Sequence, residues 1–341
     1  MNFTEMTKKS SKLYANFFGM AGCGKTYSAL LFATTLASNN NKVLVIDTES
    51  RASIYANDFK GVRIYKPESA TIQLIINAIK EAKKQNFEAV VIDSLTPLWD
   101  GDDGLMTKAM LASNKSHGAN WQLPKQIINT FTQFLKNSGL HIIVTSLAKE
   151  EVKFQKGSTG KDERVLTGNI LPIFERAKFE PYLDLQLLLN KNGVIKKIEK
   201  GMHSDIIKEI QNEKQASKKL ATFIKNWINE GEVEDNEQKF LNTEKRLSDE
   251  LKKEELESKK DEIFEVIKNK TSIETQQWYN NIATSEEKDV YNKHARHFID
   301  LKKIYKDTLE AERFIDESDD ELPEINTQLT AETKQDGGTL F

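Results

Sequence analysis

One short stretch, residues 19–26, constrains the fold of this chain more than any other feature. It reads Gly-Met-Ala-Gly-Cys-Gly-Lys-Thr and lies between an apolar run at 13–18 and an Ala- and Leu-rich run at 26–38. The two runs predict a buried strand followed by a helix. Glycines let the connecting backbone curl until successive N–H groups point at one space, where they and the helix N-terminus bind phosphate oxygens. We therefore expect a strand, a phosphate-binding loop and a helix, the arrangement of a nucleotide site.

The residue types of this loop indicate its chemistry. Lys25 is suited to neutralise the β- and γ-phosphates of ATP, and Thr26 offers a hydroxyl ligand to Mg²⁺. A glycine-rich turn with an incidental Gly-Lys-Thr is the alternative, but it explains neither flanking element. Cys23 occupies a variable position of the loop and needs no redox role. The predicted nucleotide-binding residues are Gly19, Met20, Ala21, Gly22, Cys23, Gly24, Lys25, Thr26 and Tyr27.

The rest of the first 200 residues alternates between apolar runs and helical patterns. Apolar runs occupy 42–47, 62–66, 89–93 and 139–145, and helical spacing marks 72–84 and 127–135. This alternation predicts an α/β fold, a mainly parallel sheet with helices on both faces. Farther along, turns at 157–160 and 190–193 separate paired runs, which predicts hairpins that add antiparallel edge strands.

Two carboxylates follow strands of this predicted sheet. Asp93 ends the run 89–93, where it can hold a metal ion through water. Glu49 comes just past the run 42–47, where a carboxylate can orient and deprotonate an attacking water as a general base. The alternative for Glu49 is a loop-start residue or a helix cap. Asp47 is less suited to be the base because it lies closer to the body of the strand.

A polar pair and a basic segment follow the strand at 142–144. A side chain at Thr145 or Ser146 can touch the γ-phosphate and report its loss, and Ser146 completes a predicted catalytic set with Lys25 and Glu49. Basic residues around flexible glycines are candidates to grip nucleic-acid phosphates: Lys149, Lys153, Lys156, Lys161 and Arg164. An ordinary solvated hairpin is the alternative. A second candidate loop, 100–121, holds Trp121, which either stacks on a base or belongs to the core.

Charge is distributed unevenly along the chain. Residues 1–200 carry a net charge of +8 and residues 201–341 carry −11. This favours an anionic ligand for the first part and a regulatory or partner-binding role for the second. The single cysteine excludes an internal disulfide, and no run approaches the ~18 apolar residues that a membrane span needs. We therefore expect a cytoplasmic protein that does not contact a membrane.

Composition divides the chain into four parts. We expect a flexible N-terminus at 1–11, an ATPase domain at 12–203, a charged helical region at 204–312 and an acidic tail at 313–341. Long charged helices are predicted at 240–268 and 290–309, and the tail is expected to be disordered. The tail is similar to those by which single-strand binding proteins recruit partners. It can equally compete with DNA for the basic loops, or only solubilise the chain.

The order of the motifs resembles the RecA-type ATPase core. The resemblance runs from the phosphate loop through Ile-Asp-Thr-Glu at 46–49 and Val-Ile-Asp-Ser at 91–94 to Val-Thr-Ser at 144–146. The compact form, without a large N-terminal oligomerisation domain, is similar to phage-encoded single-strand annealing ATPases of the Sak group. This resemblance implies a RecA-like P-loop NTPase that binds ATP and Mg²⁺. Thr26 and Asp93, the Walker B acid, would then serve the metal, and Glu49 would be the catalytic glutamate.

The same resemblance implies partners and an assembly. Loops after Ser94 and after Ser146 would face single-stranded DNA, and Arg176 and Lys178 would act in trans on a neighbour's phosphate in a homo-oligomer. RecA recombinases carry Gln at the sensor position, where this chain has Thr145 or Ser146. A shorter side chain transmits the state of the γ-phosphate less directly to bound DNA.

Three functional hypotheses follow. The first is an ATP-binding and ATP-hydrolysing phage protein in the host cytoplasm that acts on single-stranded DNA in recombination, with a single-strand binding or replication protein held by its C-terminal region. The second is a helicase-loading or scaffold adaptor that binds ATP without hydrolysing it, which the acidic helices favour and Glu49 opposes. The third, a P-loop nucleotide kinase, needs an arginine-rich lid, and residues 149–178 contain only Arg164 and Arg176.

Overall fold

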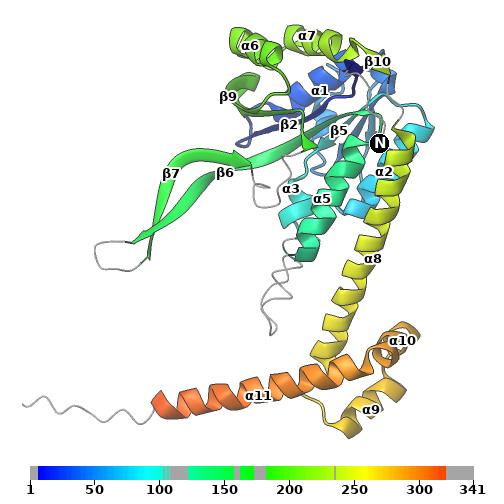
Figure 1. Ribbon diagram of the computed structural model, residues 1–341, viewed down its shortest axis with the longest axis vertical. Coiled ribbons are helices and arrows are strands. Elements are labelled where there is room, and N and C mark those ends of the chain that lie inside the picture. Colours follow the sequence, from blue (N-terminus) through cyan, green and yellow to red (C-terminus); the bar gives the residue numbers. More distant parts are fainter. Residues whose placement is uncertain are drawn as a thin grey trace, which may run out of the picture. The chain divides into compact units, whose positions relative to one another are not determined.

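The main sheet of the protein is mostly parallel (Figure 1). The structure is a computed structural model that describes residues 7–102, 104–105, 107, 122–156, 162–172, 182–233 and 236–319. The strand order is β4-β3-β5-β6-β2-β8-β9, and β7 pairs with β6. The strands are β2 (Tyr14–Gly19), β3 (Val43–Asp47), β4 (Arg63–Tyr65), β5 (Ala89–Asp93), β6 (His141–Lys156), β7 (Asp162–Pro172), β8 (Leu185–Asn190) and β9 (Val194–Lys200).

Neighbouring strands from β4 to β8 run parallel, and β8 and β9 run antiparallel. The two halves of strand β6 pair with different strands. Its first half lies in the sheet between β5 and β2, and its second half pairs antiparallel with β7, from Ala148 opposite Pro172 to Lys156 opposite Asp162. Figure 1 shows the β6–β7 pair as a long ribbon that continues beyond the sheet.

The central strands are buried on both faces, so alternate residues enter two separate cores. In β2, Ala15 and Phe17 enter one core while Tyr14 enters the other. The first core is covered by α1 (Lys25–Leu36), α6 (Ser204–Glu213) and α7 (Lys218–Asn229). The second is covered by α2 (Ile72–Lys84), α3 (Thr96–Asp100), α5 (Gln122–Lys136) and the first part of α8 (Glu237–Ile267).

The helices follow from local sequence signals. In α2, the apolar residues at 72, 75, 76, 79 and 82 form one buried face. Thr71 caps this helix by accepting a hydrogen bond from Leu74 N (3.4 Å). In α7, Ser217 caps the helix in the same way, accepting from Leu220 N at 3.1 Å. Each helix therefore presents an apolar face to the sheet and a polar face to solvent.

Contacts divide the chain into two compact units, residues 1–258 and 259–341. Helices α6 and α7 lie in the first unit with the sheet, although their composition resembles that of the charged region that follows. Residues before 12, which we expected to be flexible, include β1 (Lys9–Ser10). This strand pairs parallel with β10 (Glu232–Val233).

In the second unit, α9 (Ser272–Asn281) and α10 (Ser285–Lys293) each begin with a capping box, formed by Thr271 with Glu274 and by Thr284 with Glu287. The helix expected at 290–309 is interrupted: α10 ends at Lys293, and α11 (Ala295–Asp319) begins two residues later. Helix α11 also continues past residue 313, where we expected the tail to begin.

The predicted fold class is confirmed: an α/β fold with a mostly parallel sheet, an antiparallel edge pair and a C-terminal helical region. The predicted bounds of α2 and β5 agree with the structure, and both expected hairpins are present as β6–β7 and β8–β9. Among the described residues, no helix combines the length and apolar character that crossing a membrane requires.

Candidate nucleotide-binding site

The loop between β2 and α1 depends on glycine at two positions. Gly22 and Gly24 have φ angles of 76° and 93°, in the left-handed region that other residues rarely adopt. Space restricts Gly24 as well, because a Cβ atom there would lie 3.0 Å from Gly193 N in the turn between β8 and β9. Gly193 N also donates a hydrogen bond to Cys23 O (3.0 Å). The β8–β9 turn therefore braces the loop.

Lys25 places its ammonium group over this loop. The residue begins α1, and its Nζ atom donates hydrogen bonds to Gly19 O (3.2 Å) and Met20 O (3.0 Å). The first turn of α1 contains no acidic residue. The helix N-terminus, the loop N–H groups and the lysine together provide positive charge, which suits a polyanion such as the phosphates of a nucleotide.

Thr26 and Thr145 hold the two carboxylate oxygens of Asp93. Thr26 Oγ1 donates to Asp93 Oδ2 (2.8 Å), and Thr145 Oγ1 donates to Asp93 Oδ1. Asp93 is only 4% exposed. Burial raises the pKa of Asp93, the hydrogen bonds from Thr145 and Thr26 lower it, and the nearby charges of Glu49 and Asp47 raise it again. A cation beside this carboxylate would favour its ionised form.

The donor set around Asp93 fits Mg²⁺. A carboxylate and a hydroxyl are oxygen ligands, and Mg²⁺ in nucleotide sites is bound through one or two protein groups, with water and phosphate oxygens completing its shell. Within the described residues, no group of three or more His, Cys, Asp or Glu side chains is arranged to hold a metal ion by itself. Thr26 and Asp93 are thus suited to a metal ion that arrives with a nucleotide.

Glu49 lies at the carboxyl end of β3, beside the end of β5. Its Oε1 atom accepts a hydrogen bond from Ser94 Oγ. Thr48 and Ser94 join the two strand ends, because Thr48 Oγ1 donates to Ser94 O (2.7 Å) and accepts from Ser94 N (2.8 Å). Asp47 instead accepts from Arg51 N and Ala52 N, at 3.1 and 2.9 Å. Asp47, and not Glu49, therefore accepts the backbone N–H groups at the start of the 3₁₀ turn Ala52–Tyr55, and Glu49 is bonded to Ser94 instead.

Ser146 lies apart from this group. Its Oγ atom donates to Asn16 Oδ1 on β2 (3.1 Å), and both residues are buried. Ser146 lies on the face of β6 opposite to Thr145, because side chains alternate along a strand. Thr145, which we had considered beside Ser146 as the sensor, is the one that contacts Asp93.

The phosphate loop borders a cavity of about 720 Å³, a volume within the range of small-molecule sites. Lys25, Thr26, Glu49 and Asp93 all line it, together with Ala21, Gly22 and Gly24 of the loop. The sequence prediction missed the other walls, which no motif marks. They contain Arg51, Ile54, Tyr55, Leu147, Asn192, Gln215, Ala216, Ser217 and Lys218.

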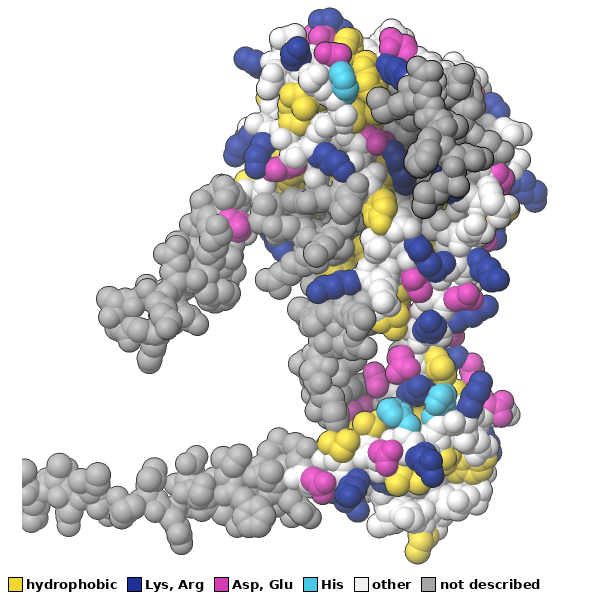
Figure 2. Space-filling view, viewed as in Figure 1, with side chains coloured by type: hydrophobic (Ala, Val, Ile, Leu, Met, Phe, Trp, Pro, Cys, Tyr) yellow, Lys and Arg dark blue, Asp and Glu magenta, His cyan; other side chains and the backbone are white. Residues whose placement is uncertain are grey.

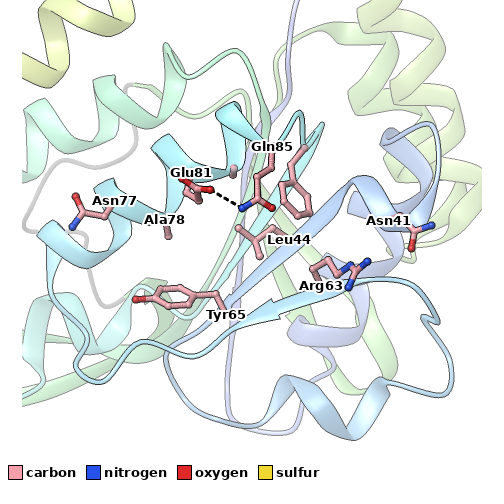
Figure 3. Close-up of a pocket in the computed structure, with 10 residues that line it drawn as sticks. Asn41, Leu44, Arg63, Tyr65, Asn77, Ala78, Glu81 and Gln85 are labelled. Atoms are coloured by element: carbon pink, nitrogen blue, oxygen red, sulfur yellow. Dashed lines mark hydrogen bonds between the residues drawn. The ribbon is translucent and has the colours of Figure 1, made fainter.

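A second cavity, of about 690 Å³, lies between α2 and strands β3 and β4 (Figure 3). Asn41, Arg63 and Tyr65 line it on the strand side, and Glu81 on α2 accepts a hydrogen bond from Gln85 (2.7 Å). No residue of the phosphate loop borders this cavity. It is therefore a separate feature of the sheet edge.

The predicted basic loop is the β6–β7 hairpin. Its pairing places Lys153 opposite Val165 and Phe154 opposite Arg164. Burial raises the pKa of Asp100, and the nearby charge of Lys149 offsets part of this rise. On the face that Figure 2 shows, Lys and Arg side chains are interspersed with Asp and Glu and do not form a single patch. Lys161, Arg176, Lys178 and Trp121 lie outside the described residues.

Comparison with protein families adds one finding to this geometry. Residues 12–173 match the family described as AAA domain. It is a P-loop NTPase family. The matched segment begins just before β2 and ends after β7, so it contains the phosphate loop, Glu49 and Asp93. Residues 12–173 therefore match an AAA-type ATP-binding domain of the P-loop class. A comparison with curated proteins finds no match.

Proposed function

We propose that the AAA domain binds ATP with Mg²⁺ and hydrolyses it. The observation that carries this proposal is the convergence of Lys25, Thr26, Asp93 and Glu49 on one cavity, although they come from three separate segments of the chain. The phosphate loop and Lys25 bind the phosphates, and Thr26 with Asp93 serves the metal. Glu49, hydrogen-bonded to Ser94, orients the attacking water and accepts its proton.

A bound Mg²⁺ would supply charge that stabilises the transferred phosphoryl group. The protein's own contribution is position. Two hydrogen bonds between Thr48 and Ser94 join the ends of β3 and β5, and these strand ends carry Glu49 and Asp93. A general base held in this way contributes typically 10²–10⁴-fold to the rate.

The proposal extends to single-stranded DNA as the partner. Two observations support it: the resemblance of the motif order to phage single-strand annealing ATPases, and the β6–β7 hairpin, which begins directly after Thr145 and Ser146. Lys149, Lys153 and Lys156 lie on one strand of this hairpin, and Arg164 lies on the other. Basic residues along such a ribbon can follow a nucleic-acid backbone. In a homo-oligomer, Arg176 and Lys178 would reach the phosphates of a neighbour, and the C-terminal region would recruit a single-strand binding or replication protein.

The DNA part of the proposal is tested by charge removal on the hairpin. Lys153→Ala/Lys156→Ala should lower both binding of single-stranded DNA and its stimulation of ATP hydrolysis, and should leave hydrolysis without DNA unchanged. A matched control is Lys196→Ala/Lys197→Ala, which removes two charges from β9. DNA binding that is insensitive to the hairpin variant would contradict the proposed DNA contact.

The other hypotheses predict different results from the same preparation. ATP binding without hydrolysis, with or without DNA, would favour the helicase-loading or scaffold adaptor. Rapid phosphoryl transfer to a nucleotide would favour the kinase.

A further inference from the structure

The cavity at the phosphate loop extends well beyond the space that phosphates need. Ser28 and Leu31 on α1 line it, one and two turns beyond the start of the helix. Thr26, Asp93 and Glu49 also line it, and the metal and the γ-phosphate would lie beside them. The part of the lining that phosphates and metal do not need is therefore left for the nucleoside of a bound nucleotide.

Part of this remaining lining is apolar and aromatic, formed by Tyr27, Ile54 and Tyr55. Tyr27 packs edge-on against Tyr55 and Phe59, with ring centroids 5.7 and 5.2 Å apart. Ile54 also lines the cavity and is 72% exposed. Such a surface suits the flat face of a nucleobase.

Another part of the lining is polar and comes from the connection between α6 and α7. Gln215, Ala216, Ser217 and Lys218 line the cavity there, together with Asn192 of the β8–β9 turn. Gln215 Nε2 donates to Asn192 O (3.2 Å), and Ala216 N donates to Gly193 O (2.9 Å). Because Gly193 N in turn donates to Cys23 O (3.0 Å), an unbroken series of hydrogen bonds fixes this wall to the phosphate loop.

Lys218 differs from the lysine that follows it. Lys219 forms ion pairs with Glu213 and Glu209. Lys218 has no ion pair or side-chain hydrogen bond with any described residue, and it borders the cavity. Its charge is therefore available to a ligand. Gln215 lies three residues before it on the same wall and presents an amide, a group that recognises the polar edge of a base.

We propose that Gln215 and Lys218 bind the nucleoside of the nucleotide, closing the site from the C-terminal side of the AAA domain. The inference rests on the proposed function, since it assumes ATP at the phosphate loop. It assigns a binding role to residues 215–218, which lie beyond the segment that matches the AAA domain. Nucleotide binding would then connect the phosphate loop to α7.

Two probes separate this inference from the proposed function: Mg·ATP, and Mg·tripolyphosphate, which has the phosphates without the nucleoside. Isothermal titration should show that Gln215→Ala and Lys218→Met each weaken ATP binding about tenfold, the loss expected when one hydrogen bond is removed. Binding of tripolyphosphate should not change for Gln215→Ala. Gln215→Ala is the decisive variant because glutamine is neutral, so the substitution leaves the charge of the site unchanged.

Two control variants are measured with both probes. Lys219→Met should bind both probes as the wild type does, and Lys25→Ala should lose both. If Gln215→Ala weakens both probes equally, or weakens neither, the nucleoside contact is wrong while the phosphate site stands. If wild type binds neither probe, the proposed function itself fails. Thermal melting of each variant verifies that these side-chain changes leave the fold intact.

Discussion

Replacing Thr145 with valine removes one hydrogen bond from Asp93 and little else. Thr145 is fully buried, and its hydroxyl donates to Asp93 Oδ1. Valine keeps the shape of the side chain but leaves that carboxylate oxygen without its partner in a buried place. A hydrogen bond to a charged group contributes about 1.5–3 kcal/mol, so Thr145→Val should lower the free energy of unfolding by about that amount where Asp93 is ionised.

The dependence of this loss on pH identifies its cause. The hydrogen bond from Thr145 lowers the pKa of Asp93 against the effect of burial, so the bond stabilises the ionised form. The loss should therefore be largest above the pKa of Asp93 and should shrink as the pH falls through it and the carboxyl group is protonated. In the variant, the pKa of Asp93 rises further, so Mg²⁺-dependent nucleotide binding should weaken at a higher pH than in the wild type.

Urea denaturation at a series of pH values provides the test. Thr145→Ser keeps the hydroxyl and deletes one methyl group, which costs about 0.8 kcal/mol by burial alone and should do so at every pH. Ser146→Ala removes the bond to Asn16 and should likewise show no pH dependence. The reasoning is refuted if the loss in Thr145→Val is the same at all pH values, or if Ser146→Ala shows the pH-dependent loss.

Two further predictions concern the phosphate loop and a buried histidine. Gly24→Ala should lower the melting temperature and nucleotide affinity more than Gly22→Ala, because both have positive φ but only Gly24 is packed against Gly193 N; equal effects in thermal melting and titration would contradict the bracing contact. Burial lowers the pKa of His141 to about 3, with smaller effects from Lys12 and Lys225. A histidine in the unfolded chain has a pKa of about 6.5. Between pH 6.5 and pH 3, the unfolded chain therefore binds a proton at His141 that the folded protein does not bind. Wild type should therefore lose about 2 kcal/mol of stability by pH 5, and His141→Asn should not; parallel stability curves for the two proteins would exclude this cause.

The fold was predictable where apolar residues recur at a regular spacing along the sequence. In α2, polar residues separate the apolar positions 72, 75, 76, 79 and 82, so both the type of element and its buried face could be predicted. The run 89–93 is short, apolar and rich in branched residues, and β5 has those bounds. Strand β1, by contrast, has only two residues. It is held by pairing with β10, and a contact of that range leaves no pattern in the sequence near it.

The site was predictable where its residues are adjacent in sequence. Residues 19–26 form one loop, so their spacing alone determines the geometry. The choice between Thr145 and Ser146 was not accessible in this way. Strand β6 is apolar on both faces at Ile143 and Val144, and without polar alternation the sequence cannot indicate which residue faces Asp93. Gln215 and Lys218 reach the cavity only through the packing of α6 and α7 on the sheet.

The most direct test of the account is ATP hydrolysis by Glu49→Gln with and without single-stranded DNA. The amide keeps the size of Glu49 but cannot accept the proton of water. The account predicts that turnover falls by 10²–10⁴-fold, the typical contribution of a general base, while titration shows Mg·ATP bound as tightly as by the wild type. Stimulation of the wild type by DNA would further support the proposed partner. A variant that hydrolyses ATP at the wild-type rate would contradict the assignment of Glu49 and with it the proposed mechanism.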